Sequence, residues 1–147
     1  MNTLIKKHAK SFYWASFFLS KPIFNKCSSL YNFCRTLDDI VDDDEKLEIK
    51  KQNFLKFKKD FIMRDEDNFI IKEMWSIIDK EKISTQVVMD LFDGVQTDLE
   101  EEVKINTKKE LLIYSYRVAG TVGLMMSKIL RVNNREALKG AIDLGIA

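Results

Sequence analysis

The stretch from Tyr31 to Asp44, YNFCRTLDDIVDDD, constrains the fold of this chain more than any other segment. At about 100° per residue, a helix through this stretch separates apolar from polar side chains. The apolar side carries Leu30, Phe33, Cys34, Leu37, Ile40 and Val41. The pattern therefore predicts an amphipathic helix with an acidic C-terminal end.

The polar side of this helix carries a specific set of residue types. Tyr31, Arg35, Asp38, Asp39 and Asp42 fall within roughly a third of the helix circumference. Residues 31, 35, 38 and 42 follow one another at i+4, i+3 and i+4 spacing, so their side chains line up over about three turns. A tyrosine, an arginine and carboxylates thus share one face.

Such an acidic face needs a partner, because like charges one turn apart disfavour a helix by a few tenths of a kcal/mol per pair. Mg²⁺ binds through one or two carboxylates, several waters and phosphate oxygens, and arginine suits bidentate phosphate binding. We interpret the stretch as a metal–diphosphate site. The alternative is a solvated acidic helix end. An EF-hand is disfavoured because the glycine and the final bidentate acid of its loop are missing.

Composition bounds the class of protein. The chain has 147 residues, 46% apolar and 32% charged, which suits one globular domain. One proline and five glycines favour an all-α protein. A net charge of +1 gives no bulk attraction to nucleic acid, and no apolar run reaches transmembrane length.

The cysteines and the histidine limit the chemistry further. Cys27 and Cys34 lie on the same predicted helix, about 10 Å apart, which is too far for a disulfide. Together with an N-terminus that lacks a signal-peptide cleavage site, this predicts a reduced, cytoplasmic protein. His8 is the only histidine, so a histidine-based metal site is excluded.

Further helices are expected along the chain. Their ranges are 3–19, 22–44, 45–63, 69–79, 84–102 with Ser84 as its cap, 108–130 opened by a Thr107–Glu110 capping box, and one that starts at Arg135. In the range 45–63, the side chains expected to face inward are Leu47, Phe54, Leu55, Phe57, Phe61 and Ile62. The acidic segment 90–102 is interpreted mostly as a solvated face.

The segment YSYRVAGTVGLMM, residues 114–126, is the second informative stretch. Gly120 and Gly123 each cost roughly 1 kcal/mol against alanine inside a helix, so their face is expected to meet a neighbouring helix backbone or to mark a bend. The opposite face suits the wall of a hydrocarbon site with one hydroxyl; it carries Tyr114, Val118, Thr121 and Met125. The alternative for that face is plain hydrophobic core.

The N-terminal segment offers a third group of polar and aromatic residues. Lys10 and Ser11, beside His8, are able to donate to a phosphate, and Phe12 opens an aromatic run. The alternative is an aromatic-rich core helix.

Taken together, HAKSFYWAS, LYNFCRTLDDIVDD, FDGVQTDL and ELLIYSYRVAGTVGLMM, in this order and at these separations, resemble the squalene/phytoene synthase family. The resemblance implies the all-α isoprenoid synthase fold. It also implies a transferase that joins two farnesyl or geranylgeranyl diphosphates head to head, through a cyclopropyl intermediate, with Mg²⁺ or Mn²⁺. It leaves the chain length of the substrate open, as well as a squalene-, dehydrosqualene- or phytoene-like product.

The resemblance also implies residue roles. Asp38 and Asp42 look like the first metal-binding aspartates, and Asp39 and Arg35 complete the catalytic set. The residues expected to contact the substrate are His8, Lys10, Ser11, Phe12, Tyr31, Arg35, Tyr114, Val118 and Gly123. The partner implied is the prenyl diphosphate, with a peripheral membrane contact as a further expectation.

This sequence departs from the family pattern in two ways. Ala9 stands where many relatives have a hydroxyl residue. More importantly, residues 1–147 correspond to the N-terminal half of the domain, without the second aspartate-rich helix. One expectation is therefore a half-enzyme that works with a separately encoded C-terminal half. The alternative is an inactive fragment or a non-enzymatic scaffold of the same fold.

Overall fold

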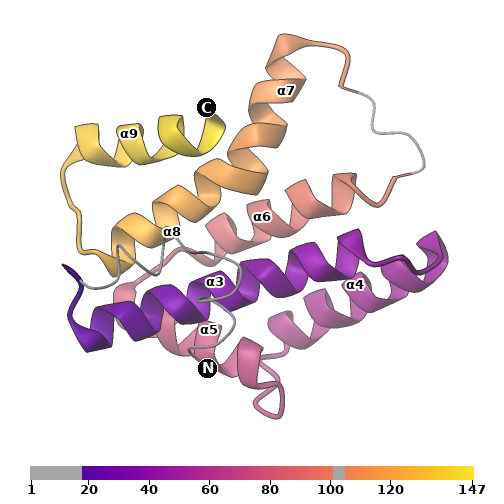
Figure 1. Ribbon diagram of the computed structural model, residues 1–147, viewed down its shortest axis with the longest axis horizontal. Coiled ribbons are helices and arrows are strands. Elements are labelled where there is room, and N and C mark those ends of the chain that lie inside the picture. Colours follow the sequence, from indigo (N-terminus) through magenta and orange to yellow (C-terminus); the bar gives the residue numbers. More distant parts are fainter. Residues whose placement is uncertain (1–17, 101–104) are drawn as a thin grey trace.

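The computed structural model describes residues 18–100 and 105–147, and every regular element in these ranges is a helix (Figure 1). The elements are α3 (Lys21–Asp42), α4 (Leu47–Ile62), α5 (Phe69–Glu81), α6 (Thr85–Thr97), α7 (Lys108–Ser115), the π-helix η2 (Tyr116–Gly120), α8 (Thr121–Ile129) and α9 (Arg135–Ile146). The all-α prediction is confirmed for these residues. The expected helix at 3–19 lies almost entirely outside them.

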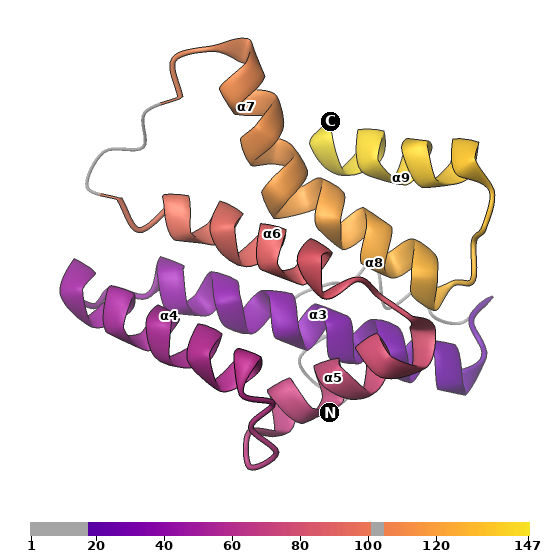
Figure 2. The same ribbon diagram turned by 180° about the vertical axis from the view of Figure 1, so that it is seen from behind.

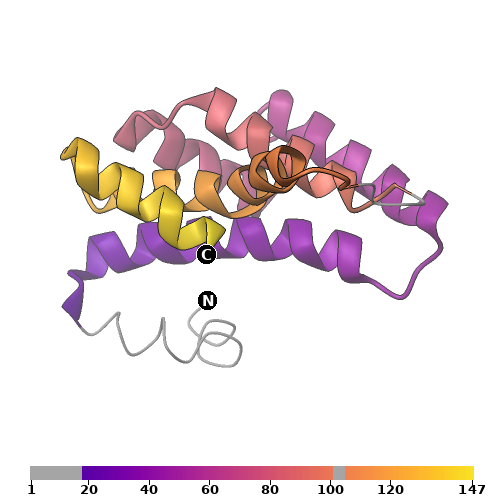
Figure 3. The same cartoon turned by 90° about the horizontal axis from the view of Figure 1, so that it is seen from above.

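The long helix α3 is the centre of the packing. It contacts α4, α5, α6 and α8, and the view from behind shows α4 and α5 along one of its sides and α6 and α8 along the other (Figure 2). Viewed from above, α3 forms one long edge of the helical layers (Figure 3). Pro22 stands in its first turn, as predicted, where the missing amide hydrogen leaves no helical bond unmade.

The other predicted helix starts are also present, with one difference in detail. Thr107 and Glu110 form the reciprocal hydrogen bonds of a capping box, and the Asn68 side chain caps α5. Ser84 occupies the N-cap position of α6, but its side chain makes no capping hydrogen bond. Helix α6 ends at Thr97, five residues before the predicted end.

An aromatic cluster fills the core beneath α3. Phe33 lies 5.5 Å from Phe61 and 5.8 Å from Phe92 between ring centroids, and Phe61 lies 5.3 Å from Phe92. Phe54 and Phe57 join it from α4. These are edge-on and tilted contacts of the kind that aromatic rings prefer.

Two residues of α4 that were expected to face inward do not. Leu55 and Ile62 are 57% and 58% exposed, whereas Phe54 and Phe61, one position earlier in each case, are 1% exposed. Each step along a helix turns the side chain by about 100°, and α4 buries only the narrow face that carries its phenylalanines. The prediction for Leu55 and Ile62 was therefore wrong.

The predicted helix 108–130 is present but divided by the π-helix η2. Its glycine face meets α9 at very short range: a Cβ at Gly123 would lie 2.4 Å from Ala141 O, and one at Gly145 would lie 2.7 Å from Ala119 O. Of the two alternatives expected for the glycine face, the close approach of a neighbouring helix backbone is confirmed.

Polar contacts fix the start of α3 beside α5. Lys26 forms an ion pair with Glu81, whose side chain is 7% exposed, and Ser29 donates to Glu73 at 3.0 Å. Arg131, just after α8, lies 3.8 Å from Glu81. In the described part of the chain, no helix is long and apolar enough to cross a membrane.

Replacing Phe92 by alanine tests the aromatic core. Phe92 is fully buried, so we expect Phe92→Ala to lower the free energy of unfolding by about 3–5 kcal/mol. Phe69→Ala is the control, because Phe69 is 52% exposed and should cost about 1 kcal/mol or less. Equal losses in urea unfolding for both variants would contradict the described core.

Candidate functional site

The acidic face of α3 lies on the surface, opposite the buried face that carries Phe33 and Leu37. Arg35 Nη2 contacts Asp39 Oδ1 at 2.7 Å, and both side chains are about half exposed, at 45% and 58%. An exposed i,i+4 pair of this kind contributes only about 0.3–0.5 kcal/mol. The arginine is thus only weakly held and remains accessible.

A cavity of about 300 Å³ opens beside this face. Residues from α3, α6, η2 and α8 line it: Cys34, Leu37, Asp38, Leu91, Val95, Val118, Ala119 and Val122. Asp38 is the only charged residue among them, so one carboxylate stands at the wall of an otherwise apolar space.

Cys34 contributes an inert surface to this cavity. Burial, with a smaller contribution from the Asp38 charge, raises the pKa of its thiol to about 12. The thiol therefore stays protonated at neutral pH and offers no nucleophilic thiolate.

A tyrosine and a second aspartate lie close to Asp38. The Tyr114 hydroxyl donates to Asp98 Oδ1 at 2.7 Å. Burial, this hydrogen bond and the charges of Asp98 and Asp38 raise the pKa of Tyr114 to about 12. The phenol therefore keeps its proton at neutral pH. Tyr114 was predicted as a site residue, whereas Asp98 was not.

The charge of Asp38 is disfavoured where it stands. Burial is the largest cause that raises the pKa of its carboxyl; Arg35 opposes it, and the charges of Asp42, Asp39 and Asp98 raise it further. The charge of Asp98, directly after α6, thus acts on Asp38 of α3. Asp98 belongs to the acidic segment 90–102, which was interpreted mostly as a solvated face, and only the packing of α6 beside α3 reveals its position.

The remaining predicted residues occupy several environments. Val118 lines the cavity, and Tyr31 is half-buried on α3, one turn before Arg35. Gly123 packs against the α9 backbone at Ala141. His8, Lys10, Ser11 and Phe12 lie outside the described residues.

In residues 114–126, the face opposite Gly120 and Gly123 is mostly hydrophobic core. Thr121 and Met125 are fully buried, and the Thr121 hydroxyl donates to the Arg117 carbonyl of its own helix at 2.8 Å. The core interpretation is thus confirmed for Thr121 and Met125. Val118 lines the cavity and Tyr114 bonds to Asp98, and for these two residues the wall of a hydrocarbon site stays a prediction.

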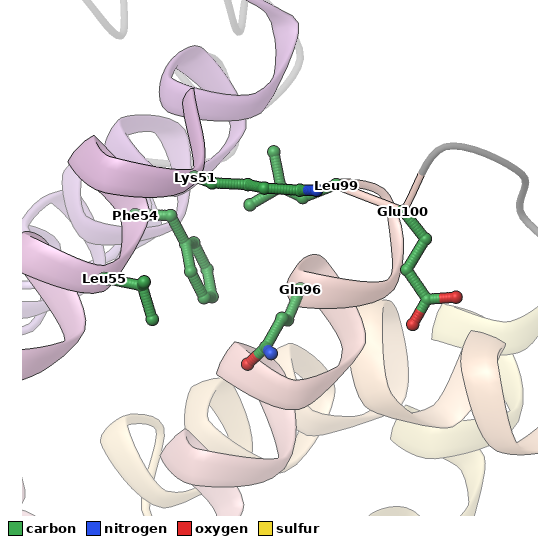
Figure 4. A pocket seen from close by; sticks show the side chains of 6 residues that line it. All are labelled: Lys51, Phe54, Leu55, Gln96, Leu99 and Glu100. Atoms are coloured by element: carbon green, nitrogen blue, oxygen red, sulfur yellow. The ribbon is translucent and has the colours of Figure 1, made fainter. Parts of the chain in front are cut away.

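A different cavity, of about 180 Å³, lies between α4 and the end of α6 (Figure 4). Its polar lining side chains are Lys51, Gln96 and Glu100. None of the residues of the acidic face lines it. We therefore place the candidate site at the cavity beside Asp38.

Within residues 18–100 and 105–147, no group of three or more His, Cys, Asp or Glu side chains is arranged to hold a metal ion by itself.

Comparison with known proteins gives a consistent picture. The family model described as Squalene/phytoene synthase matches residues 5–147. The chain is 30% identical to a phytoene synthase of Rhodobacter capsulatus over 148 residues, which cover 98% of this chain and 43% of that protein. It is also 30% identical to a bifunctional lycopene cyclase/phytoene synthase of Leptosphaeria maculans, over 86% of this chain and 25% of that protein.

A solved structure agrees in fold. A dehydrosqualene synthase, crystallised in complex with a ligand, superposes with a TM-score of 0.72 at 27% identity, over 97% of this chain and 50% of that one. This confirms the expected isoprenoid synthase fold. The chain spans at most half the length of these relatives. Since the family model covers residues 5–147, the chain belongs to the squalene/phytoene synthase family.

Proposed function

We propose that this chain forms the first metal–diphosphate half-site of an enzyme that condenses two prenyl diphosphates head to head. The observation that carries the proposal is the position of Asp38, where the acidic face of α3 meets an apolar cavity. A prenyl diphosphate has the same two parts, a highly charged head and a hydrocarbon tail.

The donor set suits Mg²⁺ or Mn²⁺. Asp38 and Asp42 are one turn apart, and Mg²⁺ uses one or two carboxylates together with waters and substrate phosphate oxygens. The raised pKa of Asp38 reflects burial and neighbouring negative charges, which a cation would offset. When bound, the cation would neutralise charge that develops on the departing diphosphate.

The side chains of this chain would do the remaining work. Arg35, released from its exposed pair with Asp39, would bind diphosphate oxygens, and Tyr31 lies on the same face. The apolar wall around Val118 would exclude water from a carbocation, which water would otherwise trap. Tyr114 would present a neutral hydroxyl, held by Asp98, close to the diphosphate.

The second set of ligands would come from outside the residues that we describe. Helices α7 and α9 contain no buried residue, and Leu112 and Leu144 are 45% and 80% exposed. Such apolar helix faces favour contact with another helical segment, so the partner that we propose for them is the C-terminal half of the family's fold. The exposed faces equally suit a scaffold protein of this fold, but the carboxylates and Arg35 beside a cavity favour the enzymatic half-site.

Asp38→Asn should stabilise the metal-free chain, because it removes a charge that is disfavoured in the folded state. We expect a gain of about 0.5 kcal/mol at pH 7, the size of one like-charge pair one turn apart. Since the folded-state pKa is raised, the cost of the charge is present above that pKa and vanishes as the pH falls. The gain should therefore disappear near about pH 3.

Thermal unfolding in a chelating buffer measures this effect. Asp44→Asn, after the end of α3, is the control and should change stability less. An Asp38→Asn variant that unfolds below the wild type at pH 7 would show that the carboxylate is stabilised by a partner rather than strained.

Calorimetric titration with farnesyl thiodiphosphate, with and without Mg²⁺, tests the proposed function. We expect Mg²⁺-dependent binding that falls at least about 100-fold in Asp38→Ala/Asp42→Ala, because two charge-assisted contacts are lost. Asp43→Ala/Asp44→Ala removes the same charge from the same acidic run and should bind within about threefold of the wild type. Equal losses in both double variants would mean that only the general negative charge matters.

A further inference from the structure

Helix α6 presents a stripe of residues to the segment that carries Tyr114 and Val118. Asp90, Gly94 and Asp98 recur every four residues, and each step of four drifts by only about 40° around a helix. They therefore share one face of α6, which also contacts η2.

A tyrosine lies near each end of this stripe. The Tyr114 hydroxyl donates to Asp98 Oδ1 at 2.7 Å. Burial raises the pKa of Tyr116, the first residue of η2, and the charge of Asp90 raises it further. The Tyr114–Asp98 hydrogen bond thus ties the segment that leads into η2 to the end of α6.

Gly94, midway along the stripe, allows the two backbones to approach. A Cβ at Gly94 would lie 2.7 Å from Arg117 Cβ, 2.9 Å from Val118 Cγ1 and 3.0 Å from the Arg117 carbonyl carbon. The first two distances are shorter than real Cβ contacts, and the obstacle includes backbone that cannot rotate away. A glycine inside a helix costs about 1 kcal/mol against alanine, so close packing is the physical reason for it here.

The segment seated on Gly94 is the π-helix η2, in which the Thr121 amide donates to the Tyr116 carbonyl five residues earlier. A π-turn holds an extra residue, so it changes the direction of the side chains that it carries; such turns are frequent at functional sites. Val118 and Ala119, in the middle of η2, line the cavity beside Asp38.

We propose that Gly94, with Asp90 and Asp98 on either side, is a positioning residue that seats η2 and thereby sets Val118 against the cavity. It acts through Val118 and touches no ligand itself. The part that concerns a ligand rests on the proposed function: Gly94 would govern binding of the hydrocarbon tail, whereas the diphosphate head is bound from α3.

Gly94→Ala and Gly140→Ala make a matched pair of variants in the full chain. Both add one methyl group to a helical glycine, but a Cβ at Gly140 would meet nothing within 4 Å. Methyl NMR of valine-labelled protein measures the chemical shifts of the Val118 methyl groups, which depend on how η2 packs on α6. The Val118 signals are assigned with the Val118→Ile variant. Calorimetry with Mg²⁺ then compares farnesyl thiodiphosphate with inorganic pyrophosphate.

In Gly94→Ala we expect the Val118 methyl signals to shift and the Kd of farnesyl thiodiphosphate to rise at least about tenfold, while the Kd of pyrophosphate changes less than about threefold. Gly140→Ala should leave all three readouts unchanged. If Gly94→Ala does not fold, Tyr114→Phe, which adds no volume and removes the hydrogen bond to Asp98, should shift Val118 in the same way by a smaller amount.

Unchanged Val118 signals in folded Gly94→Ala, or equal weakening of both probes, would overturn the inference. If the wild type binds neither probe and the Val118 signals still shift in Gly94→Ala, the proposed function fails and the seating of η2 by Gly94 stands.

Discussion

The burial of one side of α3 is the constraint on which the rest of the structure depends. Phe33 and Leu37 are completely buried, and Phe33 packs against rings from α4 and α6. The helical period fixes the angle between side chains. When Phe33 and Leu37 are buried, Arg35, Asp38 and Asp42 therefore lie away from the buried face. The core thereby determines where the acidic face lies and how closely α6 and η2 approach it.

The electrostatics of the site follow from that arrangement. Asp38 is held at the wall of an apolar cavity with negative neighbours on its own helix, and Asp98 approaches from α6. Tyr114 offers Asp98 a hydrogen bond, so this second carboxylate has a protein donor. Asp38, whose charged form is disfavoured, is the member of the group that we propose as a cation ligand. The disfavoured charge of Asp38 lowers the stability of the folded chain at the place where we propose that a cation binds.

Much of the fold and part of the site could be predicted from the sequence, because they depend on local rules. Three features follow from proline geometry, side-chain hydrogen bonds and glycine size: Pro22 in the first turn of α3, the capping box at Thr107 and the close approach at Gly123. The exposed position of Leu55 and the position of Asp98 beside Tyr114 could not be predicted. Both depend on which helix packs on which face. An acidic run at the end of α6 has the same sequence pattern whether it faces water or lies beside a functional site.

We propose that Asp38 and Asp42 hold a cation to which a prenyl diphosphate binds. Anomalous diffraction from crystals soaked with Mn²⁺ and farnesyl thiodiphosphate tests this proposal. We expect an anomalous peak at about 2–2.3 Å from carboxylate oxygens of Asp38 or Asp42 and from a diphosphate oxygen, with the farnesyl tail beside Val118. A peak at Asp43 or Asp44 instead, or a diphosphate bound away from α3 with no metal at Asp38, would contradict it.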